Sequence, residues 1–277
     1  MRRLIVPCAL AALGLAPSAL GAPSVRIRAA AVRIVAQPED RRDILITLLH
    51  AAPGLRIKIS RFSGQWFVTG DVAHKVRGCR PVGGRPSVQL WGRGDVDYDD
   101  LPQVLVRMPL DARSSANGAV FGAVGRSRTL DLVNEGCGDW TLANVAGQLR
   151  LDQAGSGEVH AGAAGRASLN VSGSGSILVQ AILGPLTAVS NSSGDIIVRS
   201  LDGDLDARIA GSGSIRTLEG TAPRLKASIA GSGSVRFDGV ADSLDAAIAG
   251  PGDVIVAHVT GKVTRRVFGS GAIRVGS

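Results

Sequence analysis

The chain has 277 residues and a formal net charge of +8; 45% of its residues are apolar, 37 are glycine and 3% are aromatic. This apolar share argues against an intrinsically disordered chain, and the length suits one elongated domain or two compact ones. The positive charge favours acidic partners such as anionic glycans or lipid head groups, with a merely soluble basic surface as the alternative.

Residues 1–21 have the pattern of a secretory signal peptide. Arg2 and Arg3 form a basic start, residues 4–15 are apolar but too few to span a bilayer, and small residues permit cleavage after Gly21 or Ala22. No later stretch approaches the roughly 18 apolar residues of a membrane helix. We therefore expect an exported protein, in the periplasm or at the cell surface, with no integral membrane segment after signal removal.

Residues 22–90 predict a β-segment that caps the rest of the chain. Apolar and polar residues alternate in several stretches, for example Gln65–Val68, and residues 72–87 form a loop rich in glycine, proline and arginine. This loop carries Cys79. Only Cys79 and Cys137 remain after signal removal, and an isolated pair in an oxidising compartment is a natural disulfide candidate.

A Gly-Ser-Gly motif, with some variation, recurs from residue 136 to the end of the chain. We call its second glycine the marker glycine. The marker glycines follow one another at a near-constant spacing, and they are Gly138, Gly157, Gly175, Gly194, Gly213, Gly233, Gly252 and Gly271. A regular period of about 19 residues indicates a repeat architecture. Gly118 and Gly94 look like degenerate earlier turns of the same kind.

The positions around each marker glycine predict two short strands per repeat. Two residues after it stands a β-branched residue such as Ile215 or Val235, and before it runs the pattern Leu-x-Ala-x-Ile, as at Leu225, Ala227 and Ile229. No 3.6-residue stripe occurs. We therefore expect residues 91–277 to form a parallel β-solenoid, a single-stranded and right-handed β-helix with coils of about 19 residues.

Some core columns contain polar residues. Six residues before the last marker glycine stands Arg265, where earlier coils have leucine or alanine. A charge at this position predicts that the terminal coil is protected against end-to-end stacking with another molecule. Local irregularity of the repeat is the alternative. Asn134 and Gln153 fall in one column of adjacent coils, and Ser190 stands there in a later coil. An amide ladder or a wider polar end of the core would each explain them.

The Gly-Ser-Gly motif does not fit a phosphate-binding loop, because neither a third glycine three residues later nor a helix follows it. Calcium-binding β-rolls need an acid at every turn, and here an acid follows only half of the marker glycines. A single calcium site at Asp202, Asp204 and Asp206 is conceivable, with a solvated acidic loop as the favoured alternative. We assign no cofactor.

Catalytic motifs are lacking: the four histidines are scattered, and neither G-x-S-x-G nor H-E-x-x-H occurs. We assign no catalytic, cofactor-binding or metal residues. Arg216, Arg236 and Arg274 share one outward column that Ile255 interrupts, and they form the candidate binding face; a solvated basic face is the alternative. Nucleic acid is not an expected partner, since the aromatic platforms that stack single-stranded bases are missing.

The run GCGDW at Gly136–Trp140, the Gly-Ser-Gly turns after it and the closing FGSGAIRVG resemble the head GIN domain family of exported bacterial proteins, which is labelled auto-transporter adhesin. The resemblance covers roughly Val25–Gly276. It implies a β-helical, exported, non-enzymatic protein, and it supplies no catalytic residues.

The sequence thus favours an exported, non-enzymatic β-solenoid that acts as an adhesin-like or envelope-binding protein. Its expected partner is an anionic envelope polymer or another envelope protein. The alternatives are a structural envelope protein without a dedicated ligand and, third, a β-helix enzyme that acts on polysaccharides. The sequence makes no prediction about the oligomeric state.

Overall fold

The computed structural model of the protein describes residues 23–82 and 84–276, so the predicted signal peptide lies outside the described residues. Apart from one short 3-10 helix, η1 (Tyr98–Asp100), the elements in these ranges are β-strands. Among them no helix is long and apolar enough to cross a membrane.

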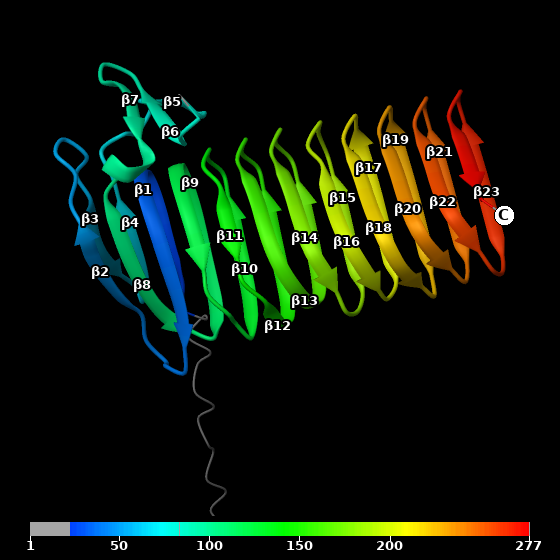
Figure 1. Ribbon diagram of the computed structural model, residues 1–277, viewed down its shortest axis with the longest axis horizontal. Helices are drawn as coiled ribbons and strands as arrows, with labels where there is room; N and C mark the ends of the chain where they lie inside the picture. Colours follow the sequence, from blue (N-terminus) through cyan, green and yellow to red (C-terminus); the bar gives the residue numbers. More distant parts are fainter. Residues whose placement is uncertain (1–22, 83, 277) are drawn as a thin grey trace, which may run out of the picture.

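Two parallel sheets face each other along a rod (Figure 1). Sheet one contains, in order, β3 (Lys58–Phe62), β4 (Gln65–Thr69), the first half of β1 (Val25–Glu39), the first half of β9 (Asp111–Val124), β10 (Thr129–Asn134), β12 (Val145–Gln153), the second half of β13 (Glu158–Val171), β15 (Leu186–Ser190), β17 (Leu205–Gly211), β19 (Leu225–Gly231), β21 (Leu244–Ala249) and β23 (Val263–Phe268). Sheet two contains β2 (Leu45–His50), β8 (Gln103–Pro109), the second halves of β1 and β9, β11 (Trp140–Leu142), the first half of β13, β14 (Ser176–Ile182), β16 (Ile196–Asp202), β18 (Ser214–Ala222), β20 (Ser234–Ala241), β22 (Asp253–Val259) and β24 (Ala272–Val275).

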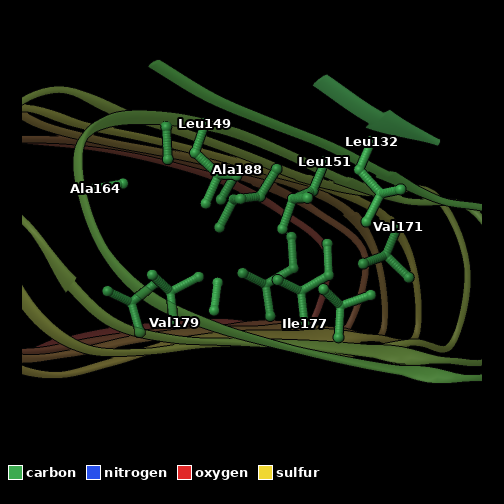
Figure 2. Close-up of a cluster of buried hydrophobic side chains, with 14 of the residues drawn as sticks. Leu132, Leu149, Leu151, Ala164, Val171, Ile177, Val179 and Ala188 are labelled. Carbon is green, nitrogen blue, oxygen red and sulfur yellow. The ribbon is translucent and has the colours of Figure 1, made fainter. Parts of the chain in front are cut away.

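The strand registers confirm the predicted parallel β-solenoid. Leu205 pairs with Leu225 and Leu225 with Leu244 in sheet one, and the β-branched column runs in the same way through sheet two. The space between the sheets is filled by aliphatic side chains (Figure 2), with Leu149 and Leu151 on one side and Ile177 and Val179 on the other. A narrow core of this kind suits Ala, Val, Ile and Leu better than aromatic rings.

The marker glycines lie on top of one another at one corner of the coil. The backbone N–H of Gly233 donates to the carbonyl oxygen of Gly211 in the coil before it, at 3.1 Å. A Cβ added at Gly233 would overlap the carbonyl oxygen of Gly213, and the same holds at Gly271 against Gly252. These glycines are therefore required by the close approach of successive coils rather than by a ligand.

At the N-terminal end the chain leaves the simple repeat. β1 forms a whole coil by itself and is flanked by β9 on one side and by β4 and β8 on the other. The antiparallel strands β3 and β2 add to the outer edges of β4 and β8 and close this end of the rod. The pairing is thus parallel throughout the stacked coils and antiparallel at the cap.

Of the two predicted early turns, the one at Gly118 lies at the same corner but is shifted by two positions, and the one at Gly94 is wrong. The register of this coil pairs Ala119 with Cys137. Gly118 therefore contacts Gly136, and Val120, not a glycine, contacts the marker glycine Gly138. Gly94 is not a corner of the solenoid. It begins β7 (Gly94–Asp97), a strand of a separate small antiparallel sheet.

That small sheet consists of β5 (Val76–Cys79), β6 (Ser87–Leu90) and β7, and it packs on the solenoid through a second apolar cluster that includes Leu101 and Phe121. The predicted disulfide is confirmed: Cys79 of β5 is bonded to Cys137 beside the first marker glycine, with 5.5 Å between the Cα atoms. The bond closes a loop over 58 positions of sequence. It therefore fastens the small sheet to the start of the regular rod.

Replacing both cysteines by alanine is expected to lower the free energy of unfolding by about 3 kcal/mol, because the unfolded chain gains the entropy of the opened loop. Guanidinium unfolding followed by circular dichroism measures this change. Reductant should lower the midpoint of the wild-type protein and leave that of the C79A/C137A variant unchanged. Equal midpoints for the oxidised wild type and the variant would contradict the stabilising role.

The C-terminal coil, drawn in red in Figure 1, leaves one edge of each sheet without a further strand in the described chain. Its core-facing positions are only partly covered: Val263 is half-buried and Val267 is 41% exposed. Arg265 stands between them, opposite Ala246 of the coil before, and is exposed. A guanidinium in the middle of this apolar end opposes stacking of a second rod.

The variant R265V should therefore self-associate more strongly than the wild type, since valine would complete an apolar end face. Sedimentation velocity at increasing protein concentration detects the shift to larger species. The matched control is R266V, which removes the neighbouring charge from the side of the coil that carries the ion pair with Asp245. If R265V and R266V sediment alike, Arg265 does not protect the edge.

Candidate binding face

The candidate binding face lies on sheet two. Arg216 of β18 pairs directly with Arg236 of β20, then Ile255 of β22 follows, and Arg274 of β24 comes last. We call Arg216, Arg236 and Arg274 the arginine column. All three side chains are exposed, and Ile255 interrupts the column as the sequence predicts. Parallel register at about 4.8 Å per strand places Arg216 and Arg236 next to each other.

The members of the arginine column differ in their partners. The Nε of Arg236 donates to both carboxylate oxygens of Asp238, at 2.7 and 2.8 Å, and this hydrogen bond, with the attraction of the charges, raises the pKa of Arg236. The Nη1 of Arg274 lies 3.5 Å from Asp253. Arg216 makes no ion pair with any residue in the described ranges. Its guanidinium is therefore the most available to an external anion.

The column continues toward the N-terminus with apolar residues. Ile197 of β16 pairs with Arg216, and Leu178 of β14 pairs with Ile197; both are half-buried. Cations and aliphatic side chains thus share one outward row. Such a row can attract an anionic chain and also contact its less polar parts.

Several arginines on sheet one and at the corner before it pair with neighbouring acids. These pairs are Arg208 with Asp206, Arg224 with Asp204, and Arg266 with Asp245. A further acid, Asp202, accepts a hydrogen bond from Thr221 at 2.8 Å. The carboxylates of Asp202, Asp204 and Asp206, the conceivable calcium site, therefore each contact a different side chain. They do not converge on one point.

The acids that follow marker glycines cap the next coil. Asp195 accepts hydrogen bonds from the backbone N–H and the hydroxyl of Ser214, both at 2.8 Å, and Asp253 accepts one from the backbone N–H of Ala272 at 3.0 Å. Asp139 does the same for Glu158. Their oxygens thus satisfy backbone groups of the corner, which is a structural task.

The polar residues of the core are hydrogen-bonded, and two of them, Asn134 and Gln153, are joined by their side-chain amides. Asn134 donates to the side-chain oxygen of Gln153 at 3.0 Å, and Gln153 donates to the carbonyl of the marker glycine Gly157 at 2.8 Å. Ser190 likewise donates to the carbonyl of Gly194 at 2.9 Å. Buried donors and acceptors are thereby paired across the corner, as burial demands.

Groups suited to metal binding or acid–base chemistry stay apart. The Nε2 of His160 lies 3.0 Å from a carboxylate oxygen of Glu158, and both side chains are about half exposed. In residues 23–82 and 84–276 no group of three or more His, Cys, Asp or Glu side chains comes together. A lone exposed His–Glu pair provides neither a nucleophile nor a closed site.

One aromatic feature was missed from the sequence. Trp91, directly after β6, is 65% exposed, and the guanidinium carbon of Arg77 lies 4.0 Å from its ring centroid. Arg77 and Trp91 come from different positions of a small antiparallel sheet, and no repeat marks either of them. Only the strand pairing brings them together.

The fold and the face define an extended parallel β-solenoid with a basic row on one side. Residues 183–277 match the model of the family described as "Putative auto-transporter adhesin, head GIN domain", so the resemblance to that family is confirmed over these residues. A search of curated proteins finds no match.

Two solved structures are similar to this chain. A protein from Parabacteroides distasonis ATCC 8503 described as "Putative lipid binding protein" has 17% identity and a TM-score of 0.53, over 92% of each chain. A protein from Parabacteroides merdae ATCC 43184 described as "a putative adhesin" has 18% identity and a TM-score of 0.47, over 92% of this chain and 91% of that one. At 17% identity, the likeness to the first of these structures concerns the fold alone.

Proposed function

We propose that this protein is an exported, non-enzymatic, adhesin-like β-solenoid that binds an anionic polymer of the cell envelope through the arginine column. The observation that carries the proposal is the row of exposed guanidinium groups on the C-terminal coils of sheet two, interrupted only at Ile255. The family match at residues 183–277 supports it, because that stretch contains the whole arginine column.

The geometry supports a polymer better than a small ligand. Successive coils present side chains about 4.8 Å apart along a straight row, so a chain that runs along the rod meets Arg216, Arg236 and Arg274 in turn. Each contact is exposed to water and weak by itself. Affinity would therefore come from several contacts made at once and would fall as salt is added.

The variant R216E/R236E should lose about tenfold in affinity for immobilised polygalacturonate at low salt, because two attractive contacts become repulsive. Retention on the polymer, measured against a neutral dextran resin, provides the test. R126E/R166E is the matched control, since it reverses two arginines that lie outside the column.

Equal retention of R216E/R236E and the wild type would contradict the proposal. So would an equal loss in R126E/R166E, since binding would then follow net charge alone. Turnover of the polymer by the purified protein would favour the polysaccharide-acting enzyme instead.

A further inference from the structure

A second basic feature lies at the other end of the rod, near the start of β1. It is a cleft of about 750 Å³, a size within the range of roughly 300–1,000 Å³ that is common for small-ligand sites. Four arginines from separate segments line it: Arg26, Arg42, Arg61 and Arg113. We call it the arginine cleft. None of these residues belongs to the repeat or to the arginine column.

Strand pairing explains how the four arginines meet. Arg26 in β1 pairs with Ser115 of β9, two residues after Arg113. Arg61 in β3 pairs with Trp66 of β4, and Trp66 pairs with Val25, next to Arg26. Arg42 comes from the connection between β1 and β2. Four separate segments therefore supply one cleft, with Arg113 coming from the most distant part of the chain.

The charges in the arginine cleft are unbalanced. Among the described residues that line it, Asp131 is the one acid, and it already contacts Arg113 at 3.2 Å and Arg150 at 3.9 Å. Arg26, Arg42 and Arg61 make no side-chain hydrogen bond or ion pair within the described ranges. Their guanidinium groups are thus solvated and ready for an anion.

One further carboxylate lies close by. The hydrogen bond from Arg41 lowers the pKa of Asp43, and the charge of Arg61 lowers it further against the opposing effect of burial. Asp43 is therefore ionised and is held by Arg41, at 3.1 Å. It offsets only part of the charge of the cleft, because its direct hydrogen-bond partner is Arg41, which lies outside the cleft.

The rest of the lining favours a sugar over a lipid chain. The other polar members are Ser24, Ser63, Gln65, Ser114 and Ser115, and the apolar ones are Pro23, Val25 and Val133. Hydroxyl and amide groups between guanidinium groups can serve the hydroxyls of a saccharide, while each planar guanidinium can hold a carboxylate with two hydrogen bonds. Within the described part of the chain, no long aliphatic or aromatic side chain is among the lining residues.

We infer that the arginine cleft binds a short acidic oligosaccharide, whose carboxylates pair with Arg26, Arg42 and Arg61. This site is separate from the arginine column and does not depend on the proposed function. Arg61 also lies over the ring of Trp66, with 5.7 Å between the guanidinium carbon and the ring centroid. A ligand that engages Arg61 should therefore change the fluorescence of Trp66.

Titration calorimetry with tetragalacturonate tests the inference on the purified protein, whose first residue is determined by mass spectrometry. The wild type should bind tetragalacturonate and should show no binding of maltotetraose, a neutral sugar of equal length. R42E/R61E should weaken binding at least about tenfold, and R42Q/R61Q by less, as expected for charge-assisted contacts. The fluorescence response to the sugar should disappear in W66F.

R126E/R166E is again the matched control and should bind as the wild type does. Arg42 and Arg61 are exposed, so their variants should retain the wild-type circular dichroism and melting curve. If R42E/R61E nevertheless fails to fold, the inference is tested by the weaker binding expected of R42Q/R61Q and by the loss of the fluorescence response expected in W66F.

Several outcomes would overturn the inference. They are absence of binding at low salt, equal binding of maltotetraose, and an equal loss in R126E/R166E. Capture by phosphatidylglycerol vesicles that is lost in R42E/R61E, without binding of the tetragalacturonate, would assign the cleft to a lipid head group instead. Dependence of polygalacturonate retention on Arg42 and Arg61 but not on Arg216 and Arg236 would support the cleft and contradict the column.

Discussion

The close contact between marker glycines of successive coils is the constraint on which the rest of the structure depends. A hydrogen at Cα is all that fits against the carbonyl oxygen of the glycine in the coil before. This contact lets corner N–H groups reach the coil before them, as that of Gly233 does with Gly211 at 3.1 Å. The coils can then keep the strand spacing of about 4.8 Å on both sheets at once.

Because of the same constraint, the corners of the coil have a structural role, and a binding surface is expected on the flat faces of the sheets. The corners are filled by their own backbone, by acids such as Asp195 that cap the next coil, and by Ser190 and Gln153 from the core. Little of their hydrogen-bonding capacity remains for a ligand. The flat faces of the sheets, which the corners hold in register, are where side chains of one kind can accumulate. The arginine column on sheet two is the result.

Much of the regular rod could be predicted from the sequence because every coil repeats the same local rule. The even spacing of the marker glycines revealed the period, and the β-branched column revealed the inward face. The disulfide was predicted because Cys79 and Cys137 are the two cysteines that remain after signal removal. The N-terminal part follows no such repeat. β1 pairs in parallel with β8 and β9, which lie far along the chain, and no local pattern encodes that choice. The arginine cleft depends on these long-range pairings and was therefore missed.

The most direct test of this account compares two glycine-to-alanine substitutions by guanidinium unfolding. Gly233 is a marker glycine whose added Cβ would overlap Gly213, whereas an added Cβ at Gly78 in β5 meets nothing within 4 Å. We predict that G233A loses on the order of 3 kcal/mol of unfolding free energy and that G78A stays close to the wild type. Equal stability of G233A, G78A and the wild type would contradict the claim that stacked glycines set the spacing of the coils.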